Sequence, residues 1–114
     1  MEFSESNDFK KEFKKLKKKY LSLDDDLDNF QQVVNKFPKG SHSRHWNILK
    51  EKEIFFIIKA RMMCRYLKKS DLRVVYLYNE VNSEIVFIEI YFKGDKENED
   101  RERIKEYLKN LKTN

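Results

Sequence analysis

The apolar residues of this chain change from helical to alternating spacing after Pro38, and that change limits the folds that the chain can adopt. Up to Pro38 they recur at helical intervals. The two helical stripes consist of Phe9, Phe13, Leu16 and Tyr20, and of Leu27, Phe30, Val34 and Phe37. From Ile54 onward apolar and polar residues alternate, with many β-branched and aromatic side chains, which indicates strands. The sequence therefore predicts two amphipathic helices followed by a sheet.

The expected elements follow from these two periods and from the residues that interrupt them. A short strand over Met1–Ser4 precedes a helix that begins at Asp8. Ser22, followed by three aspartates, matches the capping box of a second helix, which Pro38 and Gly40 end. The later segments are an irregular stretch over Lys39–Glu53, strands over Ile54–Cys64, Leu72–Asn79 and Glu84–Lys93, and a helix over Asp95–Leu111.

These elements predict an α+β fold in a single small domain, residues 1–114, because a chain of that length supports one modest core. The links between the three later strands are too short for crossovers, so a three-stranded antiparallel sheet is expected. Its strand order should follow the sequence. The short N-terminal strand, the α-helical hairpin and the C-terminal helix complete the domain, with the helices on one face of the sheet.

The composition of the chain indicates the kind of partner that the protein binds and the compartment in which it resides. The net charge of +5 favours an anionic partner, either nucleic acid or an acidic protein. The single cysteine, Cys64, excludes an internal disulfide and fits a reducing compartment. No apolar run approaches the ~20 residues that span a bilayer, and the N-terminus does not resemble a secretory signal. We therefore expect a cytoplasmic protein with no membrane partner.

One face of the expected sheet gathers polar and charged side chains near one end. Strand alternation and the positions of the turns predict that it carries Lys59, Arg61, Arg73, Glu89, Tyr91 and Lys93. Ile88, Ile90 and Phe92 are expected on the opposite face, toward the helices. The predicted patch is either a solvated surface or the rim of a site.

Such a patch suits the cleavage of RNA by its own 2′-hydroxyl. That reaction develops negative charge on the phosphate oxygens, which the guanidinium groups of Arg61 and Arg73 would stabilise. It also needs a general base and a general acid. Glu89, Tyr91 or a lysine could serve as either, and the ring of Tyr91 could instead stack on a base. The residues do not choose among these roles.

Three stretches of the sequence resemble the RelE/ParE superfamily of bacterial toxins. They are "DFKKEFKKLKKKY", which resembles the first helix of the family, "IIKARMMCRYLKKSDLRVVYLY", which resembles its basic strand, turn and arginine-bearing strand, and "IVFIEIYFKGDKENED", which resembles its last strand. The resemblance implies a compact α+β toxin that a small cognate antitoxin neutralises. RelE-like members cut messenger RNA on the ribosome without a metal or other cofactor, and ParE-like members poison DNA gyrase.

The resemblance also implies roles for individual residues. Lys59 and Arg61 match the basic end of one family strand, and Arg73 matches the arginine that opens the next. Lys93 and Lys96 match basic residues after the last strand. With Glu89 and Tyr91 added from the chemistry of the patch, the candidate catalytic set is Arg61, Arg73, Glu89, Tyr91 and Lys93, and the candidate RNA-binding set includes Lys59 and Lys96.

Weaker signals lie outside these strands. His45 and Trp46 are candidate RNA contacts, although Trp46 also suits a packing role. His42 and His45 do not make a metal site, because no carboxylate or cysteine is spaced to complete a ligand set. The acidic residues between Glu97 and Glu102 should stabilise a helix start, or else help to position Lys93 or Lys96.

Three functions remain open from the sequence. The first is a toxin that acts as an endoribonuclease on translated messenger RNA. The second is a ParE-like DNA gyrase inhibitor with the same fold. The third is a non-catalytic basic module that binds RNA or protein.

Overall fold

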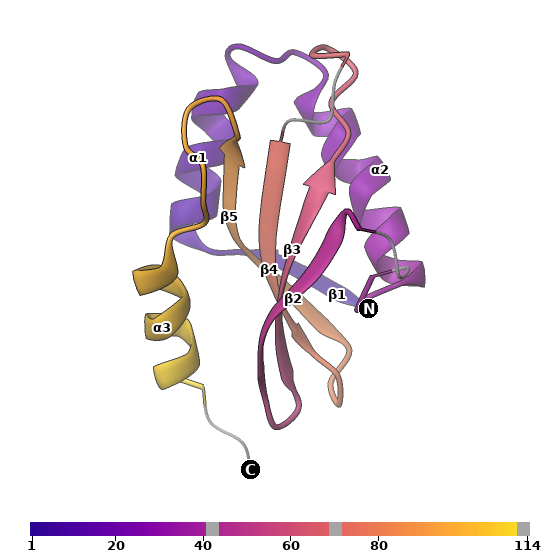
Figure 1. Ribbon diagram of the computed structural model, residues 1–114. Coiled ribbons are helices and arrows are strands. Elements are labelled where there is room, and N and C mark those ends of the chain that lie inside the picture. The colour runs from indigo at the N-terminus through magenta and orange to yellow at the C-terminus, as the bar shows by residue number, and fades with distance from the viewer. Residues whose placement is uncertain (41–43, 69–71, 112–114) are drawn as a thin grey trace.

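In the computed structural model, which describes residues 1–40, 44–68 and 72–111, five strands form one sheet and helices pack on both of its faces (Figure 1). The helices are α1 (Asn7–Lys17), α2 (Leu23–Lys36) and α3 (Arg101–Lys109). The strands are β1 (Glu2–Glu5), β2 (Trp46–Lys52), β3 (Phe55–Met62), β4 (Leu72–Asn79) and β5 (Glu84–Phe92). The α+β class is confirmed, whereas the number and order of the strands differ in detail from the prediction.

The sheet has the order β1-β5-β4-β3-β2, and two of its strands are additional to the expected antiparallel three. β1 pairs in parallel with β5, at one edge. β2 pairs with β3 at the other edge, so the irregular stretch predicted over Lys39–Glu53 is wrong for Trp46–Lys52. β2 was not predicted because most of its side chains are exposed, as is usual for a charged edge strand, so apolar and polar residues do not alternate along it. Its turn into β3 contains Glu53 at a φ of 56°, where glycine or asparagine would have signalled a hairpin.

The larger core lies between the sheet and the two N-terminal helices. Phe9 from α1 and Phe30 from α2 meet Phe87 of β5, with ring centroids 5.3 and 6.2 Å away. α1 begins at Ser6, whose hydroxyl accepts a hydrogen bond from the Phe9 amide. The predicted capping box of α2 is wrong, because the Ser22 hydroxyl instead donates to the Asp26 carboxylate at 2.6 Å.

α3 covers part of the opposite face, so the expectation that all helices share one face is wrong. Ile104 packs there in a second apolar cluster with Phe55, Ile57, Val75, Leu77 and Ile88. α3 also begins later than predicted, at Arg101 instead of Asp95. Its N-cap is Asp100, whose carboxylate accepts from the Arg103 amide, and residues 94–100 form a connecting segment. Gly94 and Asp95 lie in the turn that follows β5.

A bulge in β5 explains a second correction. Val75 pairs with Glu89 and Tyr76 pairs with Phe87, so Ile88 is the extra residue. Ile88 therefore packs beneath α3, while Ile90 lies in the larger core as predicted. The Ile88 carbonyl accepts a hydrogen bond from Arg103. The bulge leaves Glu89 and Tyr91 on the same face as Arg73, which the simple alternation had also required.

Candidate functional site

A polar cleft of about 350 Å³ lies on the face that carries α3, beyond the part that α3 covers. It is lined by Arg44, His45, Asn47, Lys59, Ala60, Arg61, Arg73 and Lys93. Five residues predicted from the sequence therefore come together: Lys59, Arg61, Arg73, Lys93 and His45. They come from β3, β4, the residue before β2 and the residue after β5.

Arg61 and Arg73 are direct partners in the β3–β4 pairing. Arg73 is buried, and one of its guanidinium nitrogens donates to the Leu72 carbonyl at 3.3 Å. Like charges directly opposite each other destabilise a strand pair. A bound anion would offset that repulsion, and a guanidinium held in a partly dry site interacts with an anion more strongly than one in water. The pair therefore makes the cleft suited to bind an anion.

Glu89 lies outside the lining of this cleft and holds the connecting segment. Its side chain is 1% exposed. One carboxylate oxygen accepts from the Asp100 amide at 2.9 Å, and the other forms an ion pair with Lys96. The Lys96 ammonium also lies 5.1 Å from the centre of the Tyr91 ring. The structure thus brings Glu89, Tyr91 and Lys96 together beside the cleft rather than in its lining, and Tyr91 is the cross-strand partner of Arg73, which does line it.

Tyr91 is buried beside this ion pair. Burial, followed by the negative charges of Glu99 and Glu89, raises the pKa of its hydroxyl to about 12. The hydroxyl is therefore protonated at neutral pH. In that form it can donate a hydrogen bond, but it does not take up a proton.

Lys59 stands at the border between the cleft and the connecting segment. Its ammonium donates to Glu99 at 2.9 Å. Burial opposes the ionisation of Glu99, but the hydrogen bond from Lys59 and its positive charge hold the carboxyl pKa below the usual value. Of the acidic residues expected to start a helix, Asp100 does so, while Glu99 pairs with Lys59 rather than with Lys93 or Lys96.

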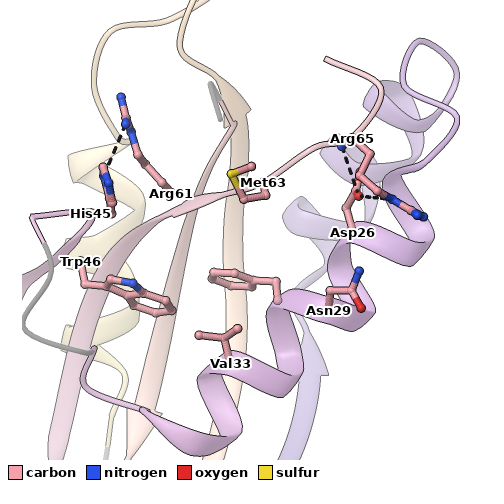
Figure 2. A pocket seen from close by; sticks show the side chains of 9 residues that line it. Asp26, Asn29, Val33, His45, Trp46, Arg61, Met63 and Arg65 are labelled. Carbon is pink, nitrogen blue, oxygen red and sulfur yellow. Dashed lines mark hydrogen bonds and ion pairs between the residues drawn. The ribbon is translucent and has the colours of Figure 1, made fainter. Parts of the chain in front are cut away.

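His45 lies between the cleft and a second, more apolar cavity of about 320 Å³ beside α2 (Figure 2). Its Nδ1 atom is 3.4 Å from a guanidinium nitrogen of Arg61. A dashed line marks this contact in Figure 2. The neighbouring Trp46 stacks on Phe30 with centroids 5.5 Å apart and packs against the larger core. This contact is the packing role foreseen for Trp46, and its contact with RNA stays a prediction.

Two residues that line the cleft were not singled out from the sequence. Arg44 and Asn47 both fall in the stretch that was expected to be irregular. Asn47 pairs with Lys59 across β2 and β3, so recognising β2 as a strand would have placed it on the same face. For Arg44 the available signal was its position next to His45, within a basic stretch.

Two general features complete the description. Among the described residues, no three His, Cys, Asp or Glu side chains are grouped so that they could hold a metal ion. His42 lies outside the described residues. No helix in the described part of the chain has the length and apolarity needed to cross a membrane.

Comparison with known proteins identifies the fold. No protein-family model matches the sequence, and no curated protein matches it. The structure is similar to a chain in the crystal structure of the archaeal RelE–RelB complex from Pyrococcus horikoshii OT3, with a TM-score of 0.61 and 16% sequence identity. The similarity covers 82% of this chain and 94% of that one. That complex is archaeal, so it does not establish the bacterial origin that the resemblance implies. The chain has a RelE-like fold.

Proposed function

We propose that this protein is the toxin of a toxin–antitoxin pair, and that it cleaves messenger RNA during translation as a metal-independent endoribonuclease. The observation that carries the proposal is the pair of arginines, Arg61 and Arg73, facing each other inside a cleft with Lys93 at its rim. A phosphate group is the anion in RNA that two guanidinium groups bind best, because its oxygens accept bidentate hydrogen bonds.

The positions of the cations match the charge that develops during cleavage. Arg73 is buried in the sheet and keeps a fixed orientation, which favours stabilisation of the transition state over simple attraction of the substrate. Arg61 and Lys93 are more exposed and can meet the incoming strand. Lys59 is partly neutralised by Glu99, so its role is to position the strand at the border of the cleft.

The proposed partners follow from the fold and the charge. The similar solved structure is a RelE–RelB complex, and we assign a cognate antitoxin to this chain by analogy. The net charge of +5 suits an acidic antitoxin as well as messenger RNA on the ribosome. This function places the protein in the cytoplasm, where translation occurs.

The test is cleavage of a defined messenger RNA on purified translating ribosomes. Wild-type protein should produce new 5′-hydroxyl ends. It should do so even when a chelator removes transition-metal ions but leaves in solution the magnesium that ribosomes need. Arg73→Ala should slow cleavage by ~10²–10³-fold, the usual effect of losing one group that stabilises a transition-state oxyanion. Lys50→Gln is the matched control, because it removes one positive charge from an exposed position on β2 outside the cleft.

Two results would redirect the assignment. If transcripts stay intact while the protein inhibits supercoiling by purified DNA gyrase, the gyrase alternative replaces the ribonuclease. If neither activity occurs but RNA or an acidic protein still binds, the protein is a non-catalytic binding module.

A further inference from the structure

We propose that His45 is the general base of the reaction, taking the proton from the 2′-hydroxyl that attacks the phosphate. This inference rests on the proposed ribonuclease function and names a residue within its site. It begins from the chemistry of the side chains that line the cleft.

The described residues that line the cleft include one side chain that can accept a proton near neutral pH. The guanidinium groups of Arg44, Arg61 and Arg73 have no acceptor atom and do not lose a proton in proteins. The lysines there are Lys59, whose ammonium is paired with Glu99, and Lys93. The ammonium group of a lysine donates hydrogen bonds and has no acceptor atom. Asn47 and Ala60 do not titrate. The imidazole of His45 remains.

The contact with Arg61 indicates which ring nitrogen of His45 would accept the proton. A guanidinium group only donates hydrogen bonds, so a bond from Arg61 to Nδ1 of His45, 3.4 Å away, requires that Nδ1 carry no proton. The lone pair needed for proton abstraction is therefore on the nitrogen that faces the arginine.

The backbone holds the ring in this place. The His45 carbonyl accepts a hydrogen bond from the Arg61 amide at 3.0 Å, which extends the β2–β3 ladder by one residue. Trp46, the next residue, is anchored by its stack on Phe30. His45 is thus fixed beside Arg61 although it precedes the strand.

Substrate binding would release the lone pair. A phosphate offers Arg61 two charged oxygens, which a guanidinium binds in preference to a neutral ring nitrogen. As Arg61 turns toward the phosphate, Nδ1 of His45 becomes available to the neighbouring 2′-hydroxyl. Arg61 therefore protects the base before RNA binds and exposes it afterwards.

The proposed step balances. The 2′-oxygen forms a bond to phosphorus, and its proton moves to Nδ1 of His45. The bond between phosphorus and the 5′-oxygen breaks, and that oxygen takes a proton from water. The products are a 2′,3′-cyclic phosphate and a 5′-hydroxyl end, and the imidazolium then returns its proton to water.

The test is the pH dependence of cleavage under single-turnover conditions on ribosome-bound messenger RNA. The charged groups around the ring are Arg44, Arg61, Arg73 and Lys93 on the cleft side, and Asp26 and Arg65 in the adjoining cavity. Wild-type protein should lose rate as the pH falls, because a general base that already carries a proton cannot accept the one from the 2′-hydroxyl. His45→Gln should be ~10²-fold slower or more, and its rate should no longer show that acidic limb.

Chemical rescue separates a base from a structural residue. Added imidazole should restore part of the rate of His45→Ala and none of the rate of Arg73→Ala. The melting temperatures of all variants show whether each one is folded, and Lys50→Gln should behave like wild type throughout.

The outcomes distinguish the two proposals. If wild-type protein does not cleave, the proposed function fails. If wild-type protein cleaves and His45→Gln keeps the rate and the acidic limb of wild type, or if imidazole does not rescue folded His45→Ala, the assignment of His45 is overturned while the function stands.

Discussion

The sheet face that carries α3 is divided into two halves with opposite chemistry. In one half Phe55, Ile57 and Leu77 lie beneath Ile104 of α3. In the other half the same strands continue as Lys59, Arg61 and Arg73, and these side chains line an open cleft. The far face shows no such division, because α1 and α2 cover it with one continuous apolar core. A change from apolar to basic residues along a strand thus marks where the cover ends and the candidate site begins.

The border between the halves is made of ion pairs whose carboxylates are buried. Glu89 binds Lys96 and the Asp100 amide, and Glu99 binds Lys59. These contacts fix the segment that leads into α3. Glu89 and Glu99 therefore have partners, and they hold the cover in place.

The largest expected effect comes from weakening the covered half. Ile104→Ala should lower the free energy of unfolding by ~2–5 kcal/mol, because it leaves a cavity between α3 and the sheet. Urea denaturation measures this, with the exposed Lys105→Ala on the same helix as the control, expected within about 0.5 kcal/mol of wild type. A loss for Ile104→Ala no larger than that of the control would show that α3 is not a stable cover.

A smaller effect is expected at the border. Glu89→Gln keeps the shape of the side chain but loses the ion pair with Lys96, which should cost ~1–2 kcal/mol in the free energy of unfolding, since Lys96 stays partly in water. Cleavage per folded molecule should stay close to that of wild type. The result decides whether Glu89, a catalytic candidate in the sequence, acts in the reaction or only holds the connecting segment.

Measuring both quantities on Glu89→Gln separates its two roles. A variant with wild-type stability and much slower cleavage would return Glu89 to the catalytic set. Arg73→Ala provides the opposite pattern, with slow cleavage as its main defect.

The sequence pattern places some residues of the two halves of the sheet face correctly and misplaces others. The faces of β3 and β4 follow from strict alternation, so Lys59, Arg61 and Arg73 were placed together correctly. Ile88 was misplaced, because a bulge shifts the alternation and nothing in a run of apolar residues marks the extra one. β2 was missed because an exposed edge strand has no apolar period.

The contacts of the charged residues could not be predicted from the sequence pattern. Glu89 was placed on the correct face, but its burial depends on a segment that returns from residues 94–100. Sequence alternation assigns a face and says nothing about what later covers it. The same holds for His45, whose neighbour Arg61 is 16 residues away and reaches it only through the β2–β3 pairing.

The smallest expected effect is a pH dependence at the border. The pKa of Glu99 is lower in the folded protein than in the unfolded chain, so its pairing with Lys59 stabilises the fold above the usual glutamate pKa of about 4.3. That stabilisation is lost as the pH falls through the depressed folded value, because the carboxyl is then protonated in both states. At pH 7 Glu99→Gln should unfold ~0.5–1 kcal/mol more easily than wild type, and by pH 3 the gap between the two should have narrowed, both measured by urea denaturation. A gap that stays constant with pH would mean that Glu99 contributes shape rather than charge, and that the border does not depend on its ion pair with Lys59.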